Sequence, residues 1–376
     1  MVHVDAQGRL LDKLDPAAAI GPTPNLPMPP SFSAGDRGKA GGESNSFDVL
    51  RLVLALLVVY SHAFLLGGFG TEGFARMVRS QTIAGTVGVL GFFGISGFLV
   101  TRSYDLRRSW VRFARARLLR IIPGFYFALL VTAFVLAPLI ARFNPAGSPW
   151  SASAAVRYLL GNLSVRIGTS TVGGVLEGLP YGASINGALW SLFPELCCYA
   201  LVLIAGVLGW IHSGRANLFV ACAGVVILNG ALAIAPKLES VAPSLLQLSG
   251  FAPIVTAFLV GSSAYCFRDV LGIGRGSAIA WTTAAAGLLK FGGWSLLGPV
   301  VLPLALINVA YSLRIRLAFD LSYGIYVLHF PVLQLLAALG VIRAGCAVYL
   351  ASAVLATAAL AMVSWHFIER PALRLK

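Results

Sequence analysis

Repeated apolar segments, each long enough to cross a bilayer, constrain the fold of this chain more than any other feature. Of its 376 residues, 58% are hydrophobic and only 11% are charged, against roughly 25% charged residues in ordinary soluble domains. In lipid such segments must hydrogen-bond their own backbone, which favours helices. The sequence therefore predicts an all-α fold, a polytopic transmembrane helical bundle of about ten spans with the lipid bilayer as a partner. The predicted spans cover residues 48–66, 83–101, 120–141, 190–210, 217–235, 247–267, 278–293, 295–312, 318–339 and 345–366.

The sequence divides the chain into a tail and a membrane domain. Residues 1–46 are rich in Pro, Gly and Ala, a composition that cannot bury a core, and we expect a disordered cytoplasmic tail there. Residues 47–376 are expected to form one membrane domain. Within it the region around residues 278–312 is the least regular, because Gly292 and Gly293 indicate either two short helices or one broken helix.

The basic residues indicate a topology rather than a nucleic-acid partner. The formal net charge is +14, but the Lys and Arg residues gather in short loops between apolar spans, with a dense run from Arg102 to Arg120. The loops on the opposite side of the predicted membrane carry fewer, so we expect both termini to be cytoplasmic and expect no nucleic-acid binding. The five cysteines lie in or beside apolar segments without zinc-type spacing, so no metal site is expected.

The first apolar span contains an arginine and a histidine, Arg51 and His62. Ionisable side chains inside such a span cost several kcal/mol and usually serve a function in the protein interior. Eleven residues of helix make about three turns plus ~20°, so both side chains project from one face, roughly 16 Å apart along the axis. Because an imidazole titrates near neutral pH, His62 is the best candidate for a general base.

A basic run after the second span contains Arg117 and Arg120, which share one helix face. Guanidinium groups at that depth suit a multiply phosphorylated ligand, since they bind phosphate bidentately. An amphipathic helix on anionic lipid is the alternative, and it is favoured for Arg112 and Arg115. Ser96 lies in the glycine-rich second span, where small residues also permit close helix packing.

Two further spans carry polar candidates. Glu195 follows Trp190 at the start of the fourth span, where it either favours the helix start or orients a hydroxyl or an imidazole. The ninth span places Tyr323 and His329 near Tyr326, and a hydrogen-bonded structural role for His329 remains an alternative.

Six segments, taken together and in this order, resemble the acyltransferase-3 family, the integral membrane O-acyltransferases of bacterial surface polysaccharides. No one of them is specific alone. They are residues 47–62, 92–98, 117–123, 189–195, 321–329 and 368–371.

The resemblance implies an enzyme of the bacterial cell (inner) membrane that moves an acyl group, commonly acetyl from acetyl-CoA, to a hydroxyl of a sugar or related acceptor. The acceptor is expected to be a glycan or a glycosylated small molecule. The family's Arg-x10-His motif falls on Arg51 and His62, and its Arg-x-x-Arg motif falls on Arg117 and Arg120. No particular oligomeric state follows from it.

The candidate site residues are assigned to three roles. Three are expected to be catalytic, three to bind the acyl-CoA co-substrate, and three to bind the acceptor. In that order they are His62, Arg51 and Glu195, then Arg117, Arg120 and Ser96, then Trp190, Tyr323 and His329.

A polytopic transporter or flippase for a polar or anionic solute is the main alternative, because intramembrane Arg, His and Glu can also line a translocation path. The absence of an internal repeat in the span pattern argues against it. The acceptor, and acetyl against longer acyl groups, stay open at this point.

Overall fold

A computed structural model describes residues 46–211, 223, 243–313, 315 and 317–376. Within these residues the regular elements are helical, which confirms the prediction of an all-α fold. The predicted tail over residues 1–46 and the predicted span over 217–235 lie outside the described residues, apart from one residue in each.

Six helical segments in the described part of the chain are long and apolar enough to cross a membrane. Two shorter apolar helices, Gly250–Cys266 and Ser322–Ala338, accompany them. The long segments are Phe47–Gly67 (α1), Ala84–Arg107 (α3), Trp110–Phe143 (α4, η2 and α5), Gly187–Val207 (η3 and α7), Trp294–Ser312 (α12) and Cys346–Leu373 (α14, η6 and α15).

The remaining helices connect or flank these segments. They are α2 (Gly73–Met77), α6 (Ala152–Asn162), α9 (Pro243–Cys266), α10 (Arg268–Leu271), α11 (Arg275–Phe291), α13 (Ser322–Ala338) and the short η5 (Val341–Ala344).

The region around residues 278–312 forms two helices, α11 and α12, rather than one broken helix. Gly292 has a φ of +114° and Gly293 a φ of +93°, backbone conformations that residues with a Cβ rarely adopt. The third predicted span, residues 120–141, is longer in the structure, because helix α4 already begins at Trp110. Its arginine-rich first turns are helical but too polar for a hydropathy pattern to include them.

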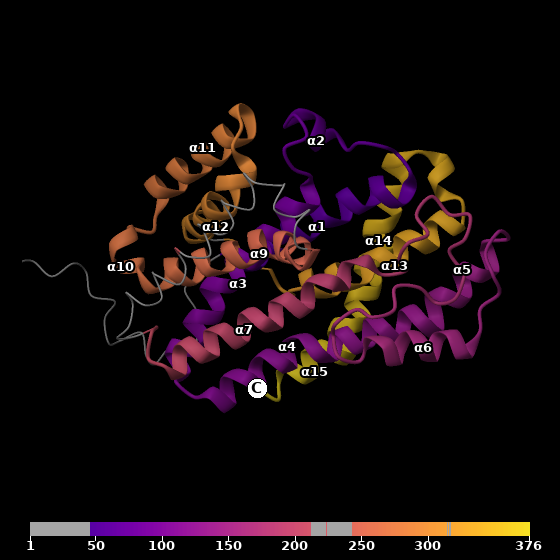
Figure 1. Cartoon of the computed structure of the whole chain (residues 1–376), viewed down its shortest axis with the longest axis horizontal. Coiled ribbons are helices and arrows are strands. Elements are labelled where there is room, and N and C mark those ends of the chain that lie inside the picture. The colour runs from indigo at the N-terminus through magenta and orange to yellow at the C-terminus, as the bar shows by residue number, and fades with distance from the viewer. Residues whose placement is uncertain (1–45, 212–222, 224–242, 314, 316) are drawn as a thin grey trace, which may run out of the picture. The chain divides into compact units, whose positions relative to one another are not determined.

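Helix α1 packs against three other helices, α3, α13 and α14 (Figure 1). Leu54, Ala55, Val58 and Val59 on α1 are each at most 3% exposed. Burial of this apolar surface fixes the rotation of α1 about its axis and with it the directions of its polar side chains.

Helices α3 and α9 approach each other closely through glycines. A Cβ built on Gly97 would overlap the carbonyl oxygen of Phe258, and one built on Gly261 would overlap that of Gly94. Small residues at helix interfaces allow this approach in membrane proteins. The glycine-rich second span therefore has a structural role at Gly97.

We expect Gly97→Ala to destabilise the protein by about 1–3 kcal/mol, because the added methyl group forces α3 and α9 apart. Gly287→Ala is the matched control: no heavy atom lies within 4 Å of the added Cβ, and alanine favours the helix by about 0.5–1 kcal/mol. Thermal unfolding in detergent measures both. Equal melting temperatures for the two variants would contradict the close packing described above.

Candidate functional site

One carboxylate joins two arginines at one end of the bundle. The Asp320 Oδ2 atom lies 2.5 Å from Arg120 Nη2 and 3.6 Å from Arg51 Nη1. Its Oδ1 atom accepts hydrogen bonds from the backbone N–H and the hydroxyl of Ser322, at 3.2 and 2.5 Å. Asp320 therefore connects α1, α4 and the start of α13. We call this region the Arg51 end of the bundle.

The charges at the Arg51 end are only partly accessible to water. The side chains of Asp320, Arg120 and Arg51 are 14%, 18% and 22% exposed. Burial by itself raises the pKa of Asp320, but attraction to Arg120 and Arg51 outweighs it and holds that pKa below its usual range. The carboxyl group is therefore ionised at neutral pH, and one negative charge faces two positive ones.

A cavity of about 300 Å³ opens beside these charges, at the small end of the range for ligand pockets. It combines cationic, hydroxyl and aromatic groups from five helical segments. Its lining residues are Arg51, Val89, Phe92, Phe93, Ser96, Leu99, Arg117, Arg120, Ile121, Ser191, Leu192, Glu195, Tyr199, Asp320, Ser322, Tyr323, Tyr326 and Lys376.

Arg117 presents unused hydrogen-bonding capacity to this cavity. Its Nη2 donates to the Ser103 hydroxyl at 3.2 Å, and its guanidinium lies 5.9 Å from the Phe113 ring and 5.8 Å from the Tyr199 ring. Its buried Nε–H has no acceptor in the described part of the chain. Buried polar groups are nearly always satisfied, so this atom indicates a missing acceptor such as a ligand oxygen.

Lys376 adds a further cation to the lining of the cavity. Burial, followed by repulsion from Arg120 and Arg117, lowers the pKa of Lys376 to about 8. The ammonium group is therefore mostly protonated at pH 7, and together with Arg117 it gives the cavity an excess of positive charge that suits an anionic ligand.

Glu195 lies deeper in the cavity and is held by two hydroxyl groups. Tyr199 donates to its Oε1 at 2.5 Å, and Ser96 donates to the same atom at 3.4 Å. The predicted residues Ser96 and Glu195 therefore come together, although 99 positions separate them in the chain. The carboxylate therefore accepts from two hydroxyl groups and also lies in the first turn of α7, where it favours the helix start.

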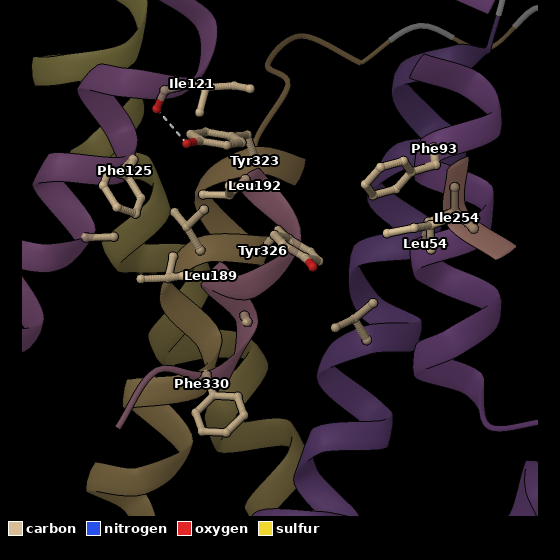
Figure 2. Packing of buried hydrophobic residues seen from close by; sticks show 14 of the residues in the cluster. Leu54, Phe93, Ile121, Phe125, Leu189, Leu192, Ile254, Tyr323, Tyr326 and Phe330 are labelled. Atoms are coloured by element: carbon tan, nitrogen blue, oxygen red, sulfur yellow. Dashed lines mark hydrogen bonds between the residues drawn. The ribbon is translucent and has the colours of Figure 1, made fainter. Parts of the chain in front are cut away.

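Two aromatic side chains of the cavity lining contact each other. The Tyr326 Oη lies 2.7 Å from the Ser191 Oγ, and the Tyr326 ring meets the Phe92 ring edge-on at 5.5 Å. Figure 2 shows Tyr326 projecting from α13 toward the helices that carry Leu54 and Phe93. Tyr323, one turn earlier, instead donates to the Ile121 carbonyl at 2.6 Å.

Beyond Tyr326 lies a pair of histidines. The His62 Nδ1 and His329 Nε2 atoms are 2.7 Å apart, and the two rings stack at 5.0 Å. His329 is fully buried, and its Nδ1 lies 2.8 Å from the Tyr326 carbonyl oxygen and 3.1 Å from that of Ile325. Since carbonyls only accept, the His329 Nδ1 carries the proton.

The protonation of His329 determines that of His62. A neutral imidazole has one N–H and one acceptor nitrogen, so the His329 Nε2 accepts the hydrogen bond and the His62 Nδ1 donates it. The His62 Nε2 is then left with its lone pair available. The pair therefore presents a single basic nitrogen, at the position expected of a general base.

The nine predicted site residues divide into three groups. Arg51, Arg117, Arg120, Ser96, Glu195 and Tyr323 line the cavity. Neither His62 nor His329 is among the described lining residues, and they form the separate pair behind Tyr326. Trp190 is 41% exposed and faces the Phe251 ring at 6.0 Å, outside the cavity lining.

Sequence reasoning assigned no site role to Asp320, Ser191, Tyr326 or Glu369. Glu369 is only 3% exposed and accepts a hydrogen bond from the Ser364 hydroxyl at 2.8 Å. It lies in the π-helical turn η6 (Trp365–Glu369), a feature frequent at functional sites. For Asp320, the signal available was an acidic residue at the same predicted membrane face as the arginines.

Comparison with known proteins places this geometry in context. Residues 44–366 match a family model described as an acyltransferase domain. The chain is 24% identical to an O-acetyl transferase of Shigella phage Sf6, over 87% of this chain and 96% of the phage protein. It is 28% identical to nodulation protein 10 of Rhizobium leguminosarum bv. viciae, over 90% and 95% of the two chains. No solved structure matches the chain.

We expect Asp320→Asn to destabilise the protein, because it removes the carboxylate that Arg51 and Arg120 share and leaves Arg51 only its exposed partner Asp48. Removing one partner of a buried pair costs about 3–5 kcal/mol, and the residual exposure of these side chains favours the lower end. Thermal unfolding in detergent measures the loss.

Asp269→Asn is the matched control, since the Arg268–Asp269 pair spans 4.0 Å and Asp269 is 56% exposed. An exposed pair contributes about 1 kcal/mol at most. An Asp320→Asn protein as stable as the Asp269→Asn protein would show that the shared carboxylate does not hold the helices together.

Proposed function

Since the chain belongs to the acyltransferase-3 family and is a membrane acyltransferase, we propose that it transfers an acetyl group from acetyl-CoA to a sugar hydroxyl. The proposed acceptor is a surface polysaccharide, a lipid-linked glycan or a related glycosylated molecule. The phage relative named as an O-acetyl transferase supports the acetyl group. The transporter alternative is not retained, because the family is one of acyl transfer.

The single observation that carries this proposal is the arrangement of α1. One face of this helix holds Arg51 in the cationic cavity and His62 in the histidine pair. The same rigid helix would thereby carry a residue that binds the phosphorylated donor and the residue that acts as the general base. Acyl transfer to a hydroxyl requires both to be held in fixed positions.

The proposed setting is the bacterial inner membrane, with about ten spans and both termini cytoplasmic. The bias of Lys and Arg toward one side supports this topology. It places the Arg51 end on the cytoplasmic side, where acyl-CoA is available, and His62 toward the opposite side.

Arg117, Arg120 and Arg51 would bind the phosphates of the donor. The buried, unpaired Nε–H of Arg117 supports this role most directly, because a phosphate oxygen is an acceptor that fits a guanidinium. Arg120 and Arg51 already share Asp320, so they contribute fixed positive charge beside the ligand. Ser96 and Glu195 would act deeper in the cavity, near the thioester.

His62 would act at the reacting atoms through its Nε2. In a direct transfer, this nitrogen takes the proton of the acceptor hydroxyl while the oxygen attacks the thioester carbonyl carbon. The C–O bond forms, the C–S bond breaks, and the thiolate takes up a proton to leave as CoA. In the second form, the imidazole nitrogen attacks the thioester carbonyl carbon first and the C–S bond breaks to release the CoA thiolate. The acyl group then passes from the nitrogen to the acceptor oxygen, the C–N bond breaks, and the hydroxyl proton ends on the thiolate.

His329 would serve as a positioning residue rather than as an acceptor ligand. It is fully buried, and its Nδ1 is committed to backbone carbonyls. Its Nε2 then holds His62 in the tautomer whose Nε2 is basic, which is the role of an orienting group in a catalytic pair. Trp190 and Tyr323 stay proposed as acceptor-binding residues.

We expect His62→Ala to abolish acyl transfer while leaving the fold intact, because general-base catalysis contributes about 10²–10⁴-fold to the rate. The measurement is transfer of labelled acetyl groups from acetyl-CoA to membrane glycans in cells that express the protein.

The matched control for His62→Ala is His366→Ala, because His366 is exposed near the end of the last long segment. It should transfer acetyl groups at the wild-type rate. Normal transfer by a correctly folded His62→Ala protein would overturn the assignment of the base.

We expect Arg117→Lys to raise the KM for acetyl-CoA with a smaller change in kcat, because lysine keeps the charge but loses the planar donor pair. Steady-state kinetics at varied donor concentration separate the two constants. Arg112→Lys is the control on the same helix, since Arg112 is exposed and outside the cavity lining. A parallel rise in KM for both variants would contradict a specific phosphate contact at Arg117.

A further inference from the structure

One face of helix α3 lines the cavity. Val89, Phe92, Ser96 and Leu99 all line it, and their spacing of three to four residues places them in one stripe on the helix. Leu99 lies about 10 Å from Phe92 along the axis. Ser191 and Tyr326 also line the cavity.

Phe92 and Tyr326 contact each other in the lining of the cavity, and we call these two side chains the inner wall. Their rings meet at 5.5 Å and 69°. The Tyr326 hydroxyl is fixed by Ser191, and these two residues are 8% and 3% exposed. A side chain that is both buried and hydrogen-bonded has few alternative rotamers, so the Tyr326 side of the inner wall has a defined position.

The inner wall lies beside the histidine pair. The Tyr326 and His329 rings lie 6.2 Å apart, and His329 contacts His62 on its other side. A donor bound by its phosphates at the Arg51 end directs its acyl group toward this wall. The space left between the thioester and Phe92 therefore limits the length of the acyl chain.

We propose that Phe92 and Tyr326 determine acyl-chain length and restrict the donor to short acyl groups. This inference rests on the proposed binding of acyl-CoA in the cavity, and it adds two specificity-determining residues and a substrate class. In a closed apolar site, one methylene changes selectivity by roughly 10–200-fold. Acetyl-CoA is accommodated, and each added methylene meets an aromatic ring.

The experiment compares the binding of CoA, acetyl-CoA, propionyl-CoA and butyryl-CoA to the purified full-length protein by calorimetry in detergent. We expect the wild type to prefer acetyl-CoA. In Phe92→Ala and Tyr326→Ala the ratio of butyryl-CoA to acetyl-CoA affinity should rise at least about tenfold. The affinity for CoA itself should change little, because CoA has no acyl group to meet the wall.

Two further variants make the result specific. Leu99→Ala truncates a residue of the same stripe nearer the Arg51 end, and it should leave the ratio of the two affinities unchanged. Phe92→Leu removes the ring with less loss of packing, so it tests the wall if Phe92→Ala fails to fold. A gain in binding of the longer donor cannot arise from misfolding.

The outcomes separate the two levels of inference. If the wild type binds neither CoA nor any acyl-CoA, the proposed donor site is wrong. If it binds CoA and acetyl-CoA but Phe92→Leu and Tyr326→Ala leave the ratio at the wild-type value, the donor site stands and the inner wall does not select acyl length. A rise in the ratio for Leu99→Ala equal to that for Phe92→Leu would likewise overturn the role of the wall.

Discussion

The carboxylate of Asp320 is the interaction on which the Arg51 end of the bundle depends. Two guanidinium groups, from α1 and α4, face one carboxylate at the start of α13, and without it they would repel each other in a partly buried environment. One negative charge balances only part of the positive charge around the cavity. Arg117 and Lys376 remain to attract an anion, so the contact that stabilises three helices also leaves the cavity electropositive.

Helices α1 and α13 meet twice, and both meetings have chemical consequences. At one end Arg51 contacts Asp320, and toward the other His62 contacts His329. The second contact depends on backbone carbonyls of α13, which set the protonation of His329 and through it that of His62. A rotation of either helix would disturb both contacts together, which explains why α1 is packed so closely on several sides.

Sequence periodicity was sufficient for the helices and for the shared face of Arg51 and His62, because both depend on local geometry. It could not show which helices are neighbours. Ser96 and Glu195 are in contact although 99 positions separate them in the chain. Arg120 and Asp320 are in contact across 200 positions. The local sequence around Asp320 predicts only a helix cap. Its ion pairs with Arg51 and Arg120 cannot be predicted without knowing that α1 and α4 lie beside it.

The aromatic ring of Tyr326, which lines the cavity and lies 6.2 Å from the His329 ring, has a consequence for the membrane as a whole. A continuous file of polar groups from Arg51 to His62 would conduct protons and water through the bundle. The Phe92 and Tyr326 rings, in contact at 5.5 Å, add apolar surface along that path. A protein built in this way can bring a donor and a base close to each other across the bilayer without discharging the ion gradient that the same bilayer maintains.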